Sequence, residues 1–118
     1  MGRSYWAAKR TKETVEKSIQ NSLCFGVFSG DRQVAFARIV TDYCTFAYLC
    51  DVFVDEEFRG RGISKWIMEK IMAYPSLQGL RRIALATKDA HGLYSQYGFK
   101  PMSEDEQLKF MVIRNDTV

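Results

Sequence analysis

The segment Val54–Met72 reads VDEEFRGRGISKWIMEKIM, and it joins two different sequence patterns. Residues 45–53, TFAYLCDVF, are largely apolar, as in a central strand of a sheet. The residues after the glycines place apolar side chains at the spacing of an amphipathic helix. Gly60 and Gly62 alternate with arginines and contribute no side chain to packing. A strand joined to a helix by Arg-Gly-Arg-Gly therefore indicates a place where a negatively charged group approaches the backbone.

This junction has the chemistry of a phosphate or pyrophosphate site. The first turn of an α-helix has unpaired N–H groups and the positive end of the helix dipole. Glycines let an anion come close to those N–H groups, and Arg59 and Arg61 add positive charge. The loop is not a Walker A motif, and Lys65 replaces the third glycine of the dinucleotide fingerprint. Taken alone, the motif is equally compatible with a glycine-rich turn that carries solvated arginines.

The composition is that of one soluble globular domain, residues 1–118. The hydrophobic fraction of 47% and the aromatic fraction of 14% can fill a core, and the charged fraction of 26% is ordinary. The net charge of +3 is too small to indicate nucleic-acid binding. No apolar run has membrane-spanning length, and residues 1–10 lack the apolar centre of a signal peptide. We therefore expect a cytoplasmic protein that binds neither membranes nor nucleic acid.

The cysteines do not indicate a metal site. Cys24, Cys44 and Cys50 form no CxxC pair, their number is odd, and His91 is the only histidine. A zinc site needs better ligand spacing than this. All three cysteines occur in apolar, strand-like surroundings, so we expect reduced, buried thiols and no bound metal.

Periodicity and turn residues predict an order of helix, hairpin, strand, helix, strand, helix and strand. The expected helices cover residues 11–21, 62–74 and 89–97, with Asp89 as the cap of the last one, and the expected strands cover 23–28, 33–41, 46–54, 82–87 and 109–114. The crossover from Phe46 to Thr87 makes its two strands parallel, whereas the hairpin before it is antiparallel. The sheet is therefore mixed, in an α/β (α+β) domain.

A second motif follows the crossover. Residues 89–99 read DAHGLYSQYGF, with Tyr94 and Tyr97 one turn apart on a short helix that Gly98 ends. FRGRGIS and LYSQYGF, in this order and with a strand between them, resemble the GCN5-related N-acetyltransferase (GNAT) superfamily. The acetyl-CoA loop of that family has the pattern [RQ]-x-x-G-x-[GA], which residues 59–64 match with Ser64 at the last position. The family's LYxxxGF segment is matched at residues 93–99.

The resemblance implies a small, bacterial-type, single-domain member with the GNAT fold. That fold has a mixed central sheet in which a parallel strand pair splays apart, with flanking helices. Family members usually have another strand before the first helix, and this chain starts inside its first helical region, so we expect that strand to be missing. A sheet edge left open in this way favours pairing with another chain. We therefore expect that a homodimer can form.

The resemblance also implies where acetyl-CoA binds. In the family the pantetheine arm lies in the gap between the splayed strands and pairs with backbone groups of the central strand, which by position are Val52, Phe53 and Val54. The pyrophosphate lies on N–H groups of the loop and helix start. The residues implied there are Arg59, Gly60, Arg61, Gly62, Ile63 and Ser64. Thr87 and Tyr97 are further candidates for contact with the arm.

The implied chemistry is acyl transfer by direct attack of a neutral amine on the thioester. The resemblance makes Tyr94 the general acid, and a phenol suits a departing thiolate better than a carboxylic acid does. Asp51 is the first candidate for the general base, because a carboxylate is out of place in the apolar run LCDVF. A hydrogen-bonded structural aspartate is an equal alternative. Cys50 is interpreted as core packing and not as a nucleophile.

Three functions remain to be compared. The first is an N-acetyltransferase that acts on a small-molecule or protein amine. The second is a non-catalytic module that has the GNAT fold and binds acyl-CoA, which the absence of the first strand favours. The third is a nucleic-acid binder that uses the arginine loop, and the small net charge weighs against it.

Overall fold

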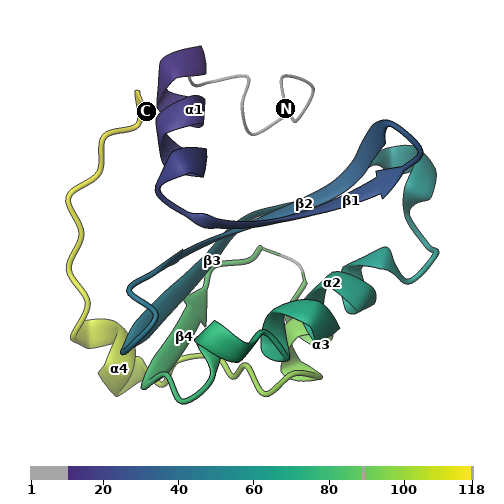
Figure 1. The fold of residues 1–118 in the computed structure, drawn as a ribbon. Helices are drawn as coiled ribbons and strands as arrows, with labels where there is room; N and C mark the ends of the chain where they lie inside the picture. Colours follow the sequence, from purple (N-terminus) through teal and green to yellow (C-terminus); the bar gives the residue numbers. More distant parts are fainter. Residues whose placement is uncertain (1–10, 89, 118) are drawn as a thin grey trace.

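The computed structural model describes residues 11–88 and 90–117, and the strands of these residues form one mixed sheet with the order β1-β2-β3-β4 (Figure 1). The strands are β1 (Leu23–Ser29), β2 (Arg32–Thr41), β3 (Phe46–Val54) and β4 (Arg82–Leu85). The α-helices are α1 (Lys12–Gln20), α2 (Ile63–Met72), α3 (His91–Ser95) and α4 (Glu104–Leu108), and short 3-10 turns cover η2 (Glu56–Phe58) and η3 (Pro75–Leu77). The predicted mixed α+β architecture is confirmed.

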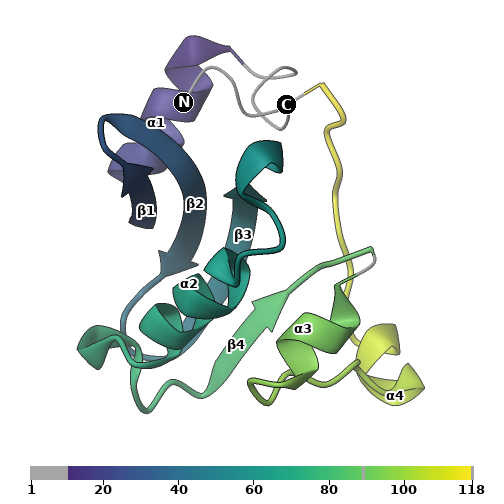
Figure 2. The ribbon, with the colours of Figure 1, turned by 90° about the vertical axis from the view of Figure 1, so that its right-hand side faces the viewer.

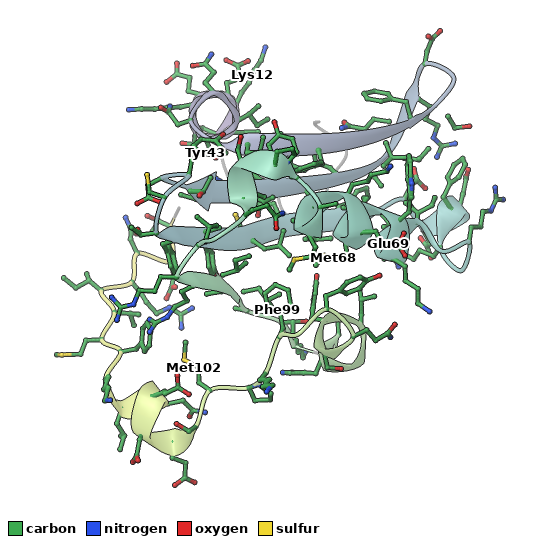
Figure 3. All side chains as sticks on the ribbon, turned by 60° about the horizontal axis from the view of Figure 1, so that its bottom comes forward. Lys12, Tyr43, Met68, Glu69, Phe99 and Met102 are labelled. Carbon is green, nitrogen blue, oxygen red and sulfur yellow. The ribbon has the colours of Figure 1, made fainter. Side chains whose placement is uncertain are left out.

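The two longer helices lie on opposite faces of the sheet (Figure 1). Helix α1 begins at Thr11, whose side chain accepts a hydrogen bond from the N–H of Thr14, and Val15 is its buried residue. Helix α2 buries Ile67, Met68 and Ile71 against the sheet. In Figure 3, Met68 points toward the sheet and Glu69, the next residue, points away from it, as expected for an amphipathic helix.

The core lies between α2 and the sheet. Strand β2 contributes Ala35, Ala37 and Ile39, which alternate along the strand and are at most 1% exposed. The register opposes Ile39 to Leu49 of β3, so these two buried side chains of the central strands meet in one layer. Small alanines on β2 let α2 approach closely, and the larger side chains of the helix fill that space.

Strands β3 and β4 pair in parallel, as the sequence predicts for a strand–helix–strand crossover. Their ladder begins at Phe46↔Arg82 and ends at Leu49↔Leu85, although β3 continues to Val54. Beyond Leu85 the two chain segments diverge, and Figure 2 shows β3 and β4 pointing in different directions. The predicted splayed parallel pair is therefore present.

The carboxyl-terminal part of the chain differs from the sequence prediction. Residues 109–114 form no strand, and α4 occupies residues for which no helix was predicted. The side chain of Ser103 accepts a hydrogen bond from the N–H of Glu106, and Glu106 bonds back to Ser103, so a capping box starts α4. An apolar segment forms a strand only where it can pair with the edge of a sheet. Residues 109–114 do not pair with β4.

The elements near the second motif have slightly different bounds. Strand β4 ends at Leu85 and not at residue 87, and α3 covers only five residues. The predicted cap, Asp89, lies outside the described residues. The Thr87 hydroxyl accepts a hydrogen bond from the N–H of Ala90 and thus supports the turn into α3. Gly98 has φ +94, the left-handed conformation that favours glycine after a helix.

Candidate functional site

The second half of β3 has an unusual backbone. Arg38 of β2 opposes Cys50, whereas Phe36 opposes Phe53, so β3 contains one extra residue at a β-bulge. Asp51 lies in this bulge with φ +52, a conformation that is uncommon for a residue other than glycine. The bulge follows directly after the last residue of β3 that pairs with β4. The central strand therefore changes its course where its parallel neighbour leaves.

The glycine loop forms an open cradle at the start of α2. Gly60 and Gly62 have φ values of +80 and +79, which an L side chain rarely adopts. A Cβ atom at either position would meet no atom within 4 Å, so the backbone conformation and not crowding requires glycine. Gly62 is the N-cap and provides no side-chain hydrogen bond to the first turn. The space beside both glycines is thus open, and the first turn of a helix has N–H groups that can bind an anion.

The loop arginines are held by specific contacts. Arg59 Nε donates a hydrogen bond to the Val54 carbonyl over 3.2 Å. The Arg61 guanidinium lies 4.9 Å from the centre of the Phe58 ring. Both arginines are exposed, which fits a ligand that approaches from solvent and fits the alternative of solvated arginines equally well.

Arg32 supports this loop from the β1–β2 turn, a role that sequence reasoning missed. Its guanidinium lies 5.4 Å from the Phe58 ring centre and forms ion pairs of 2.7 Å with Asp55 and 2.9 Å with Glu57. The N–H of Glu57 and the Arg32 guanidinium lower the pKa of the Asp55 carboxyl. The partners are more than 20 positions apart, and only the strand register brings them together, so no local signal could have identified Arg32.

Tyr94 is the buried tyrosine of α3. Its side chain is 8% exposed and packs edge to face against Phe99, with 5.9 Å between ring centres. Burial raises the pKa of the phenol. Tyr94 lines a groove of about 810 Å³ together with Thr87 and Tyr97, so the structure brings these three predicted residues together. The residues that line this groove do not include Asp51, residues 52–54 or the glycine loop.

Tyr97 connects α3 to the glycine-loop helix. Its hydroxyl donates a hydrogen bond of 3.1 Å to the carbonyl of Lys65 in the first turn of α2. The side chain is half-buried. Tyr97 therefore sets the spacing between the helix that carries Tyr94 and the helix that begins at the loop.

Asp51 forms an ion pair that was not predicted. Its Oδ2 atom accepts a hydrogen bond of 2.7 Å from Arg38 Nε, and the two side chains are only 10% and 15% exposed. Arg38 also donates to the Ser22 hydroxyl, which in turn donates to the carbonyl of Ser18 in α1. The position of Asp51 is thus fixed from α1 through Ser22 and Arg38.

The cysteines are free, as predicted, but the prediction that all three are buried is wrong. Cys44 is exposed, because it lies in the β2–β3 turn, where its N–H donates a hydrogen bond to Asp42. Cys24 and Cys50 are half-buried. Within residues 11–88 and 90–117, no group of three or more His, Cys, Asp or Glu side chains could hold a metal ion. The same residues include no helix with the length and apolarity that a membrane span requires.

Comparison with known proteins now identifies the family. The sequence pattern of the Acetyltransferase (GNAT) family matches residues 3–99. A candidate GNAT-family acetyltransferase from Xanthomonas campestris pv. campestris has a similar solved structure, with a TM-score of 0.84 and 55% identity over 92% of this chain and 76% of that one. A candidate acetyltransferase from Gibberella zeae is 28% identical over 127 residues, which cover 89% of this chain and 71% of that protein.

A more distant structure shares the fold. It is a candidate acetyltransferase from Clostridium acetobutylicum that was solved with acetyl-CoA, and it has 14% identity and a TM-score of 0.65 over 86% of this chain and 71% of that one. The family pattern covers most of the chain and both motifs. The chain therefore belongs to the GNAT acetyltransferase family.

Proposed function

We propose that this chain transfers an acetyl group from acetyl-CoA to an amine. The observation that carries this proposal is the position of the open glycine cradle beside the half of β3 that β4 leaves. An anion-binding helix start and a strand segment that lies beyond the β4 ladder together suit an elongated ligand with a diphosphate and an amide-containing arm. Acetyl-CoA is such a ligand, and the solved relative from Clostridium acetobutylicum holds it.

The glycine loop and strand β3 would bind different parts of acetyl-CoA. We assign the pyrophosphate to the backbone N–H groups of residues 59–64 and the pantetheine arm to the edge of Val52 and Phe53. Val54 belongs to the same edge, but its carbonyl already accepts a hydrogen bond from Arg59. Thr87 and Tyr97 line the groove beside β4, and we assign them to contacts with the arm. The open space around Gly60 and Gly62 supports this fit, since a side chain there would occupy the cradle.

Tyr94 is the proposed general acid. The amine nitrogen attacks the thioester carbon, a C–N bond forms, and the C–S bond breaks as the phenol gives its proton to the leaving sulfur. Burial favours the neutral phenol, so Tyr94 remains protonated at neutral pH and can donate its proton. The products are the acetylated amine and CoA.

Asp51 is the proposed general base, acting directly or through a water molecule. Its carboxylate would take the proton that the attacking amine loses, and Arg38 would hold it in place. The same ion pair also supports the alternative that Asp51 only stabilises the bulge. The acceptor amine belongs to a small molecule or a protein. Free cysteines fit a reducing cytoplasm, where we place the enzyme.

The test is release of thiol from acetyl-CoA in the presence of a panel of amines, combined with calorimetric titration of acetyl-CoA. We expect binding and amine-dependent thiol release. Gly62→Asp should abolish both, because it adds a side chain and a negative charge to the cradle. Gly30→Asp is the matched control, since Gly30 also has a positive φ of +61 and open space but lies in the β1–β2 turn. Equal losses in the two variants would contradict the assigned cradle.

Two further outcomes separate the candidate functions. Binding of acetyl-CoA without turnover of any amine would contradict the enzyme and support an acyl-CoA-binding module. A folded protein that does not bind acetyl-CoA would overturn both assignments.

A further inference from the structure

The segment that leads from β3 into the glycine loop is rich in acidic residues. Residues 55–61 read DEEFRGR, with three carboxylates against two guanidinium groups. Carboxylates repel an anion that binds near them unless a positive charge neutralises them. The need for such a charge rests on the proposed function, since acetyl-CoA brings a diphosphate to this loop. We therefore looked for a cation that another part of the chain contributes to this segment.

One of the three carboxylates, that of Asp55, also shapes the turn before the loop. Its Oδ1 atom accepts a hydrogen bond of 3.1 Å from the N–H of Glu57 and thereby caps η2. The N–H of Asp55 donates to the Val34 carbonyl over 2.7 Å, which fixes the start of the turn against β2. An asparagine could accept the same capping hydrogen bond without a charge. The charge of Asp55 can therefore be tested separately from its role in the turn.

The cation comes from the β1–β2 hairpin, whose tip lies beside the turn that follows β3 in Figure 1. Arg32 Nη2 lies 2.7 Å from Asp55 Oδ2, and Arg32 Nη1 lies 2.9 Å from Glu57 Oε2. One guanidinium thus binds two of the three carboxylates. The planar fork of donors in arginine suits such a double contact, whereas the ammonium group of a lysine acts as a point charge.

The same guanidinium also contacts the aromatic ring that precedes the loop arginines. It lies 5.4 Å from the centre of the Phe58 ring, and the guanidinium of Arg61 lies 4.9 Å from the same centre. Phe58 is half-buried and packs against the core. The ring therefore connects the hairpin with the glycine loop, and Arg32 contacts it as well as both carboxylates.

These ion pairs lie at the surface. The side chains of Arg32, Asp55 and Glu57 are 47%, 23% and 71% exposed. Exposed ion pairs contribute little to the stability of a fold. Their charges still act on an anion that approaches the same surface, and dissolved salt screens this effect. The contribution of Arg32 should therefore appear in ligand binding and much less in stability.

We propose that Arg32 is a positioning residue of the acetyl-CoA site. It neutralises Asp55 and Glu57 and holds Phe58, so that the diphosphate reaches the N–H groups of the glycine loop without repulsion from the adjacent carboxylates. The β1–β2 hairpin is then part of the acetyl-CoA site through a residue more than 20 positions away from the loop. Arg32 acts through its partners and takes no part in the acyl transfer.

The test is calorimetric titration of acetyl-CoA into the wild type and Arg32→Gln, at ionic strengths of about 0.02 M and about 0.5 M. At low salt we expect the dissociation constant to rise roughly 10-fold in the variant, and at high salt the difference should nearly disappear. The melting temperature should change little. In steady-state kinetics the KM for acetyl-CoA should rise, whereas kcat at saturating acetyl-CoA should stay nearly constant.

The matched control is Arg114→Gln. Arg114 is also an exposed arginine in an ion pair, with Asp116, and it belongs to the carboxyl-terminal tail, which Figure 1 shows on the other side of the molecule from the β1–β2 hairpin tip. Its substitution removes the same charge from the protein as a whole but not from the loop. The affinity for acetyl-CoA should therefore remain that of the wild type.

Two further variants separate charge balance from a merely structural role. The triple variant Arg32→Gln/Asp55→Asn/Glu57→Gln removes both carboxylates together with their cation, and it should recover the affinity of the wild type. Glu57→Gln alone leaves Arg32 with an excess of positive charge and should bind acetyl-CoA more tightly than the wild type does. If Arg32 only held the fold together, the loss of more of its partners would restore nothing.

The possible outcomes distinguish this role from the proposed function. A wild type that does not bind acetyl-CoA would overturn the proposed function, and the role of Arg32 with it. If the wild type binds, the role of Arg32 alone is overturned by an unchanged affinity in Arg32→Gln at low salt, by an equal loss in Arg114→Gln, or by a loss that salt does not reduce. A triple variant as weak as Arg32→Gln, or a Glu57→Gln variant that binds no more tightly than the wild type, would also overturn it.

Discussion

The two halves of β3, residues 46–49 and residues 50–54, differ in their strand partners and in the roles that we assign to them. Residues 46–49 pair with β4 and residues 47–49 also pair with β2, and Ala47 and Leu49 are 1% and 3% exposed. Residues 50–54 contain the bulge, lie beyond the β4 ladder and are mostly half-buried. One strand thus provides a core element and, directly after it, the segment to which we assign the pantetheine arm. The difference teaches that the proposed site lies where the pairing of β3 with β4 ends.

The largest expected effect concerns Tyr94, the proposed general acid. Tyr94→Phe keeps the ring that packs against Phe99 but removes the proton donor. We expect turnover to fall by about 10²–10⁴-fold, while acetyl-CoA affinity and stability stay nearly constant. Because burial raises the pKa of Tyr94 above that of an ordinary phenol, the wild-type donor should remain protonated at neutral pH. Steady-state kinetics and calorimetry measure both quantities, and unchanged turnover would remove Tyr94 from the acid role.

The next effect belongs to the paired half and should appear in stability alone. Leu49→Ala empties a site in the core opposite Ile39 and should lower the free energy of unfolding by about 2–5 kcal/mol. The variant that remains folded should bind acetyl-CoA as well as the wild type does. Val52→Ala is the corresponding truncation in residues 50–54. It should lower the free energy of unfolding less than Leu49→Ala does, since Val52 is only half-buried. Urea denaturation compares the two, and a larger loss at Val52 would contradict the division of the strand.

Asp51 tests whether the bulge has a catalytic or only a structural role. Asp51→Asn keeps the shape and removes the charge that faces Arg38, and Arg38→Met removes the other partner. If Asp51 is the base, Asp51→Asn should slow turnover much more than Arg38→Met, and the wild-type fall in rate at acidic pH should disappear. If the ion pair is only structural, both variants should lose similar stability and similar activity. The pH–rate profiles of the two variants decide between these roles.

The smallest effect is expected in the turn that leads into the paired half. Asp42 accepts hydrogen bonds from the Thr45 hydroxyl and from the N–H groups of Thr45, Cys44 and Phe46, and these bonds lower its pKa. A lowered pKa in the folded state gives stability that is present above the unfolded value and lost as pH falls. Asp42→Asn should therefore slightly reduce stability near pH 7 and flatten its decline toward about pH 3. Urea denaturation midpoints of the wild type and the variant at the two pH values measure this decline. An equally steep decline in Asp42→Asn would contradict the assignment.

Sequence reasoning succeeded where the information is local. The glycines at 60 and 62, the helix after them and the parallel crossover follow from short patterns, and the structure confirms them. The bulge and the partners of Asp51 could not be predicted, because they depend on the register between distant strands. The strand expected at 109–114 is absent because this segment does not pair with the sheet, and a strand depends on a partner that its own sequence cannot reveal. The helix before it could have been predicted, since Ser103 and Glu106 have the spacing of a capping box.

The most direct test of this account is amide hydrogen–deuterium exchange of the wild type with and without acetyl-CoA, read for peptides that separate the two halves of β3. The account predicts that acetyl-CoA slows exchange in residues 50–54 and 60–64 and leaves residues 46–49 unchanged. Equal protection of both halves of β3, or protection confined to other segments while acetyl-CoA binds, would contradict the claim that residues 50–54 and the start of α2 form the site.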